Sequence, residues 1–228
     1  MSVSQMNSWN SKGGAFISNC MRHTAAIGTA LGVLISASQL SVAQIATSAL
    51  DAKPLGVGDR APNAHLMSIE GKDVRLKQIL KKGPTVLIFY RGGWCPYCNA
   101  HLADLQNIQP DLQKLGYQIV AVSPDLPGEL RKTMDKHSLG YQLVCDTQTE
   151  AMRGFHVAYR LDDPTYNVMK SKYGVDLESY SGKAHHVLPV PSVYIIDRKG
   201  KILFAHTDPN YKVRMKGDEV LAAAKAAL

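Results

Sequence analysis

The stretch from Ile88 to Gln106, IFYRGGWCPYCNAHLADLQ, decides the fold because it joins an apolar run to a helical pattern through two cysteines. Residues 84–90, PTVLIFY, are continuously apolar and predict a buried strand. Residues 96–115 show helical spacing, with an expected kink at Pro110. Open α/β sheets place ligands and catalytic groups where a buried strand ends and a helix begins. The cysteines therefore lie at the candidate site.

The rest of the chain alternates strand and helix patterns around this unit. The expected elements are a hairpin over residues 65–76, strands over 117–123 and 141–146, a helix over 127–140, a mostly helical stretch to about residue 180, a hairpin over 191–206 and a terminal helix over 217–228. This order predicts one α/β domain over residues 57–228, with three layers and a mixed central sheet.

The first 43 residues have the pattern of a signal peptide. The first fifty residues contain no Asp or Glu, and residues 25–38 form an apolar stretch that is short for a membrane span. Small residues at Ser41 and Ala43 predict cleavage after Ala43. We expect an exported, periplasmic protein with a flexible mature N-terminus over residues 44–56 and no membrane span after cleavage. An uncleaved anchor and a translation start at Met21 are the alternatives.

The charge of the mature chain gives no support for a nucleic-acid partner. Removal of residues 1–43 takes away Lys12 and Arg22 and no acidic residue, which lowers the net charge from +7 to +5. The sequence has no run of five like charges and no basic stripe interleaved with aromatic residues. We therefore expect neither nucleic-acid nor lipid-headgroup binding.

The spacing of Cys95 and Cys98 favours redox chemistry. Cleavage would leave these two cysteines and Cys145, an odd number that fits a redox pair better than a disulfide scaffold. Pro96 suits the first helical position, which makes Cys95 the N-cap and places Cys98 in the first turn. Unpaired backbone N–H groups and the helix dipole favour thiolate there, and Arg91 would add to that field. A thiolate attacks a disulfide or a peroxide, and a nearby second thiol resolves the product.

The cysteine pair is also compatible with a structural disulfide, with half of a zinc site and with unpaired core thiols. A disulfide across two residues closes a tiny loop and would stabilise the fold little. Zinc needs further ligands, and the sequence offers only His185, His186 and Cys145. We expect no metal and no bound cofactor. Cys145 is either a third thiol on the active-site side of the sheet or a small core residue.

Four segments resemble a known family: FYRGGWCPYC (89–98), AVSPD (121–125), LVCDT (143–147) and VPSVYIIDRKGKILFAHTDP (190–209). They are similar to the peroxiredoxin-like branch of the alkyl hydroperoxide reductase C/thiol-specific antioxidant family. The resemblance covers residues 57–228. It implies a thioredoxin-like fold with peroxiredoxin-like additions, a hydroperoxide substrate and a thioredoxin-like protein as the electron donor.

The chain departs from the peroxiredoxin motif at three places. By the resemblance, Cys98 falls on the peroxidatic cysteine, whereas Cys95 replaces the threonine that would hold the peroxide and Arg91 replaces the shielding proline. The arginine that usually precedes the strand at SVYIID is also absent, and Val190-Pro191 stands there. These departures argue against fast peroxide reduction.

The motif WCPYC resembles thioredoxin and glutaredoxin active sites, in which the first cysteine attacks. That resemblance implies that Trp94, Pro96 and Tyr97 border the thiols and contact a partner. Val190-Pro191 resembles the cis-proline strand of those proteins, whose backbone receives the partner chain. The alternative is a trans proline at the start of an edge strand.

The sequence thus predicts an antioxidant thiol oxidoreductase that cycles Cys95 and Cys98 between dithiol and disulfide. We expect Cys95 to attack disulfides and Cys98 to attack any peroxide, so the acceptor is a hydroperoxide or a disulfide-bonded protein. One alternative is a protein disulfide reductase without peroxidase activity. Another is a copper-handling module with Cys95, Cys98 and His185 or His186 as ligands. A further polar cluster receives no role: His206, Asp208, Tyr211 and Arg214.

Overall fold

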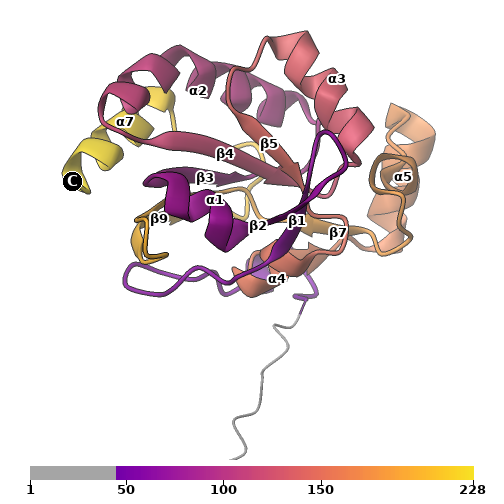
Figure 1. The fold of residues 1–228 in the computed structure, drawn as a ribbon. Coiled ribbons are helices and arrows are strands. Elements are labelled where there is room, and N and C mark those ends of the chain that lie inside the picture. The colour runs from indigo at the N-terminus through magenta and orange to yellow at the C-terminus, as the bar shows by residue number, and fades with distance from the viewer. Residues whose placement is uncertain (1–44) are drawn as a thin grey trace, which may run out of the picture. The chain divides into compact units, whose positions relative to one another are not determined.

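The computed structural model describes residues 45–228 (Figure 1). The predicted signal peptide, the cleavage after Ala43 and the alternative start at Met21 lie outside the described residues. Within residues 45–228, no helix combines the length and the apolar character needed to cross a bilayer.

A mixed seven-stranded sheet forms the centre of the domain, in the order β2-β1-β5-β4-β3-β8-β9. The three strands β3, β4 and β5 are parallel, whereas β8 runs antiparallel to both β3 and β9, and β1 runs antiparallel to both β2 and β5. The bounds are β1 His65–Ser68, β2 Asp73–Arg75, β3 Thr85–Phe89, β4 Gln118–Ser123, β5 Gln142–Cys145, β8 Ser192–Ile196 and β9 Ile202–Thr207. The mixed central sheet predicted from the sequence is confirmed.

Helices cover both faces of this sheet (Figure 1). The helices α2 (Pro96–Lys114), α3 (Pro127–His137) and α7 (Gly217–Ala226) pack on one face, and α1 (Leu76–Lys82) and α4 (Glu150–Gly154) pack on the other. Every residue of β3 is buried because alternate side chains point to the two helical layers. This explains the continuous apolar run, and the predicted three-layer arrangement is confirmed.

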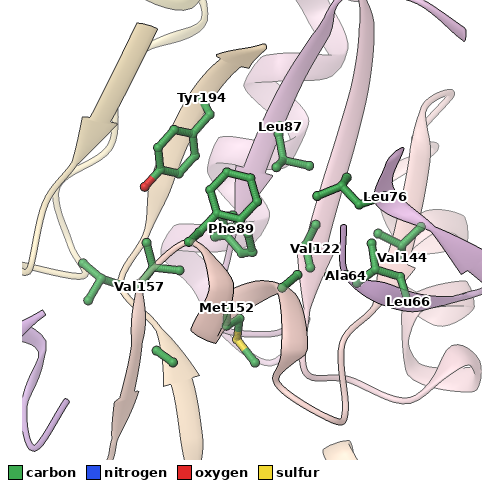
Figure 2. Close-up of a cluster of buried hydrophobic side chains, with 14 of the residues drawn as sticks. Ala64, Leu66, Leu76, Leu87, Phe89, Val122, Val144, Met152, Val157 and Tyr194 are labelled. Atoms are coloured by element: carbon green, nitrogen blue, oxygen red, sulfur yellow. The ribbon is translucent and has the colours of Figure 1, made fainter. Parts of the chain in front are cut away.

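An aromatic cluster fixes the end of β3 on the α4 face. The ring of Phe155 lies 5.0 Å from the ring of Phe89 and 4.9 Å from the ring of Tyr194, centre to centre. Figure 2 shows Phe89 and Tyr194 side by side among the aliphatic side chains of the same layer. Because Phe89 is the last residue of β3, this packing holds the strand at the point where the cysteine loop begins.

The region after β5 contains strands that the sequence did not indicate. It was predicted to be mostly helical to about residue 180, and it does contain α4, α5 (Asp163–Tyr173) and α6 (Leu177–Ser181). It also contains β6 (Ala158–Arg160), which pairs antiparallel with β7 (Val187–Pro189) in a separate two-stranded sheet. Strands of three residues are too short to show a period of two.

The segment 45–56 is not the flexible lead that was expected. It contains the short 3₁₀ helix η1 (Ala49–Asp51), and Ala46 pairs in parallel with Tyr159 of β6. The Leu55 N–H donates to the Phe155 carbonyl at 3.1 Å. The physical reason is that the outer edge of β6 has unpaired backbone groups, and the lead satisfies them.

Candidate active site

The loop between β3 and α2 is held in a tight turn. Gly92 has a φ of 151°, and a Cβ there would collide with the Trp94 indole and the Asp125 carboxylate. The Cys95 N–H donates to the Gly92 carbonyl at 3.1 Å, and the Asn99 side-chain amide donates to the Gly93 carbonyl at 2.7 Å. The turn therefore presents Cys95 at the N-cap of α2.

Cys95 is the N-cap of α2, as the sequence predicted. Pro96 occupies the first helical turn, and the Cys98 N–H donates to the Cys95 Sγ at 3.4 Å. The pKa of Cys95 is lowered to about 6, first by the hydrogen bond from the Cys98 thiol, and further by the Cys98 N–H and the charges of Arg91 and Arg214. Near neutral pH, Cys95 is therefore largely a thiolate.

Cys98 has the opposite character. It is fully buried, and burial raises its pKa well above the ordinary value, with the neighbouring Cys95 sulfur adding to the effect. The Arg214 Nη2 donates to the Cys98 Sγ at 3.4 Å, which works in the other direction but does not reverse it. The pair is thus asymmetric: Cys95 carries the negative charge and Cys98 holds the proton.

This asymmetry predicts how the thiol titration responds to loss of Cys98. In Cys98→Ala, the largest stabilising contact of the Cys95 thiolate disappears. We expect its pKa to rise from about 6 toward the ordinary cysteine value of about 8.5. Ultraviolet absorbance of the thiolate as a function of pH measures this, with Cys145→Ser as a control that leaves the Cys95 midpoint in place. An unchanged midpoint in Cys98→Ala would assign the low pKa to the helix and the arginines instead.

Two arginines without acidic partners flank the thiols. Arg91 is buried, and its guanidinium lies 4.2 Å from the centre of the Tyr211 ring and 4.9 Å from that of Trp94. Tyr211 also meets the half-exposed Tyr97 edge to face at 5.9 Å. Within residues 45–228, neither Arg91 nor Arg214 forms an ion pair with a carboxylate. Their charges are therefore available to the sulfurs.

Asp125 is a buried carboxyl group beside the cysteine loop. Its Oδ2 accepts a hydrogen bond from the Gly93 N–H at 2.7 Å, whereas its Oδ1 has no partner within the described residues. Burial raises the pKa of Asp125 to about 7, and a negative charge on Cys98 raises it further. A small hollow with room for about one water molecule adjoins it beside Trp94. Asp125 is thus able to exchange a proton near neutral pH.

The backbone at Val190-Pro191 does not match its predicted role. No peptide bond in residues 45–228 is cis, so Pro191 is trans. The Val190 N–H donates to the Val157 carbonyl at 2.8 Å, and the Asp208 N–H donates to the Pro191 carbonyl at 3.3 Å. These bonds occupy the backbone N–H of Val190 and the carbonyl of Pro191, to which a partner strand would have to bind. The first bond extends the pairing of β6 with β7, which the sequence did not indicate, and the second extends the pairing of β8 with β9. The alternative was a trans proline at the start of an edge strand. Its trans bond is confirmed, whereas the strand that follows, β8, is not at an edge because it lies between β3 and β9.

The two histidines are engaged away from the thiols. The His185 Nδ1 accepts from the Val187 N–H at 2.9 Å, so its Nε2 is the donor to the Thr147 carbonyl at 3.1 Å. His186 binds Glu178 at 2.9 Å. In the described part of the chain, no three His, Cys, Asp or Glu side chains are grouped to hold a metal ion. The copper-handling alternative required His185 or His186 as a ligand together with Cys95 and Cys98, and residues 45–228 contain no such grouping.

Cys145 lies at the end of β5, parallel to β3, as expected for the active-site side of the sheet. It is buried in the same apolar cluster as Cys95 and Cys98. Burial raises its pKa, which keeps it protonated. Its surroundings fit the core-residue alternative.

The sequence did not identify three site residues: Arg214, Tyr211 and Asp125. Arg214 and Tyr211 belong to the polar cluster after β9 that received no role. The Arg214 guanidinium contacts Cys98. The position directly before Ser192, where the family resemblance would place an arginine, is Pro191. Asp125 ends AVSPD, a segment used only for the family resemblance. A carboxyl group directly after a buried parallel strand was the available signal.

Comparisons with known proteins address the family and the fold of the chain. The AhpC/TSA family profile matches residues 57–205. The chain is 26% identical over 149 residues to thiol-disulfide oxidoreductase ResA of Geobacillus thermodenitrificans, which covers 65% of this chain and 67% of that protein. It is 31% identical over 105 residues to a putative peroxiredoxin bcp of Haemophilus influenzae, which covers 46% of this chain and 66% of that protein. Each match thus spans about two thirds of the relative.

Solved structures show the same fold. Peroxidoxin BcpB from Mycobacterium tuberculosis superposes with a TM-score of 0.58 at 20% identity, over 75% of this chain and 97% of that one. At this identity the likeness concerns the fold alone. The thioredoxin-like, peroxiredoxin-like architecture expected from the sequence is confirmed.

Proposed function

Because the chain belongs to the AhpC/TSA family and is a thiol oxidoreductase, we propose that it reduces disulfides, with Cys95 as the attacking thiolate and Cys98 as the resolving thiol. The observation that carries this proposal is the asymmetry of the pair. The pKa of Cys95 is lowered to about 6, whereas burial raises that of Cys98. Only Cys95 is a nucleophile in the resting dithiol.

The first step is attack of the Cys95 thiolate on a sulfur of the substrate disulfide. A Cys95–substrate bond forms, the substrate S–S bond breaks, and one substrate thiolate leaves and takes up a proton. The flanking Arg91 and Arg214 stabilise negative charge among these sulfurs. The substrate remains linked to the protein at the start of α2.

In the second step, Cys98 loses its proton and attacks Cys95, which releases the second substrate thiolate. The buried Asp125, whose pKa is about 7, is the proposed proton acceptor. The charge of Arg214 favours the Cys98 thiolate that forms. The substrate has then gained two electrons, and the protein holds a Cys95–Cys98 disulfide.

Two electrons from outside must restore the dithiol. We assign this role to a thioredoxin-like protein that repeats the exchange in reverse, and we place the reaction in the periplasm because residues 1–43 have a signal-peptide pattern. An oxidising compartment supplies disulfide-bonded proteins as substrates. No bound cofactor takes part in this cycle.

A second candidate function, hydroperoxide reduction, is favoured by the cover over the thiols. The residue Cys95 is only 1% exposed, and the segment 208–216 contacts the site through Tyr211 and Arg214. A protein disulfide must displace this segment, whereas a hydroperoxide is small. Arg214 would then stabilise a Cys98 thiolate that attacks one peroxide oxygen, so that the O–O bond breaks, water or an alcohol leaves, and Cys98 becomes a sulfenic acid. Attack of Cys95 on the Cys98 sulfur then forms the disulfide and releases water.

The acceptor is tested by reacting the reduced full chain with a disulfide-bonded protein and, separately, with hydrogen peroxide. We expect the disulfide reaction to be fast and the peroxide reaction to match that of a simple thiol of equal pKa. Arg214→Met, with the exposed Lys212→Met as its control, separates the candidates. If the peroxide reaction is fast and falls about tenfold or more in Arg214→Met alone, hydroperoxide reduction replaces disulfide reduction as the function.

A further inference from the structure

A basic hollow of about 400 Å³ lies at the opposite end of β3 from the thiols. It is lined by residues of α1, of the turn after β8 and of the segment before β1. Half of its ten lining residues are cations, and none is acidic. The cations are Arg60, Lys77, Lys81, Arg198 and Lys199. All five are exposed, so a ligand in solution can reach them.

Backbone carbonyls, rather than carboxylates, position the two arginines. The Arg60 Nη1 donates to the Lys199 carbonyl at 3.2 Å. The Arg198 Nε and Nη2 donate to the Lys81 carbonyl, near the end of α1, at 3.4 and 3.3 Å. A guanidinium has five N–H donors, so each arginine keeps donors without an acceptor in the described residues. The two side chains are oriented, yet they remain able to bind an anion.

The acidic residues beside these cations in the sequence bind backbone N–H groups and form no ion pair with the cations within residues 45–228. Asp197 accepts hydrogen bonds from the N–H groups of Lys199 and Lys201, both at 2.8 Å, and Asp59 accepts from the Gly56 N–H at 2.8 Å. None of the ion pairs found within residues 45–228 involves a cation of the basic hollow. Five like charges around one hollow repel each other, and a multiply charged anion would relieve that repulsion.

We propose that the basic hollow binds a phosphate-bearing anion, either a free polyphosphate or the headgroup of an anionic phospholipid. Guanidinium groups match phosphate oxygens in pairs, and ammonium groups add point charges. The volume lies within the range of small-molecule sites. No sequence pattern indicated this site, because its cations come from three separate segments. The expectation of no lipid-headgroup binding rested on the lack of a run of like charges and of a basic stripe interleaved with aromatic residues, both of which are local patterns.

The proposal is tested with the full chain and two probes: inorganic tripolyphosphate, followed by calorimetry, and phosphatidylcholine vesicles with or without phosphatidylglycerol, followed by sedimentation. We expect binding that weakens as salt is added. It should weaken about tenfold or more in Lys77→Gln/Lys81→Gln. The matched control Lys136→Gln/Lys225→Gln removes the same charge from exposed sites on α3 and α7. Thiol–disulfide activity should be equal in all three proteins.

Each outcome has a definite meaning. Binding of tripolyphosphate but not of vesicles identifies a free anion as the ligand. Sedimentation with vesicles that contain phosphatidylglycerol, without calorimetric binding of tripolyphosphate, identifies a phospholipid headgroup as the ligand. Absence of binding to both probes, or an equal loss in the control variant, overturns the proposal. Because activity is measured separately, a failure here is distinct from a failure of the proposed disulfide reduction.

Discussion

Cys95→Ser is expected to lower the rate of disulfide reduction by about 10³-fold or more, because a serine hydroxyl is not ionised near neutral pH and does not replace a thiolate. Cys98 offers no substitute, since it is fully buried and its pKa is raised. Cys98→Ser should also stop turnover, but for another reason. It should leave the first step intact and accumulate the Cys95–substrate mixed disulfide. Intact-protein mass spectrometry after reaction with a disulfide-bonded protein distinguishes the two variants.

Cys145→Ser is the matched control, because Cys145 shares the apolar cluster of the pair but takes no part in the cycle. It should keep the wild-type rate. A mixed disulfide that forms on Cys98 in the Cys95→Ser protein, at the wild-type rate, would reverse the assigned roles. That result would place the nucleophile where the peroxiredoxin resemblance placed it.

Asp125→Asn is expected to lower turnover about 100-fold, because the proposed proton acceptor of Cys98 is lost. The same change should stabilise the fold above neutral pH. The folded-state pKa of Asp125 is about 7, against an ordinary value of 3.8. The folded protein therefore binds the proton more tightly than the unfolded chain does. The wild-type stability falls as the pH rises from about 4 to about 7.

The size of this effect follows from the two pKa values. A pKa difference of about 3 corresponds to about 4 kcal/mol of stability that the wild type loses by pH 8, as an upper bound. Asparagine has no proton to lose, so we expect Asp125→Asn to exceed the wild type in denaturant unfolding at pH 8 but not at pH 4. Equal pH dependence in the two proteins, together with unchanged turnover, would remove Asp125 from the mechanism.

The sequence predicted the parts of the fold that rest on long periodic segments. β3, α2 and the N-cap position of Cys95 all followed from local patterns. The sequence missed β6 and β7, because each has three residues and depends on a partner distant in the chain. The docked lead 45–56 depends on that same ladder.

The sequence likewise predicted the site residues that lie close together in the chain and missed those that are distant. The thiol pair and Arg91 lie within one short stretch, so spacing was enough to group them. Arg214 reaches Cys98 from a position 116 residues away in the chain. Such an approach depends on the path after β9, which no local pattern encodes. The sequence did not indicate the basic hollow for the same reason, since three segments each contribute only one or two of its charges.

The environment of Cys95 separates two properties that commonly vary together in reactive cysteines, ionisation and exposure. A thiolate with a pKa of about 6 is usually exposed to any electrophile that diffuses past it. Here the charged sulfur belongs to a residue that is only 1% exposed. The nucleophile is therefore largely ionised near neutral pH, although almost none of its surface is in contact with solvent. Under the proposed function, an oxidant reaches this sulfur only when neighbouring side chains move, so we expect access to Cys95, as well as intrinsic thiol reactivity, to select among oxidants.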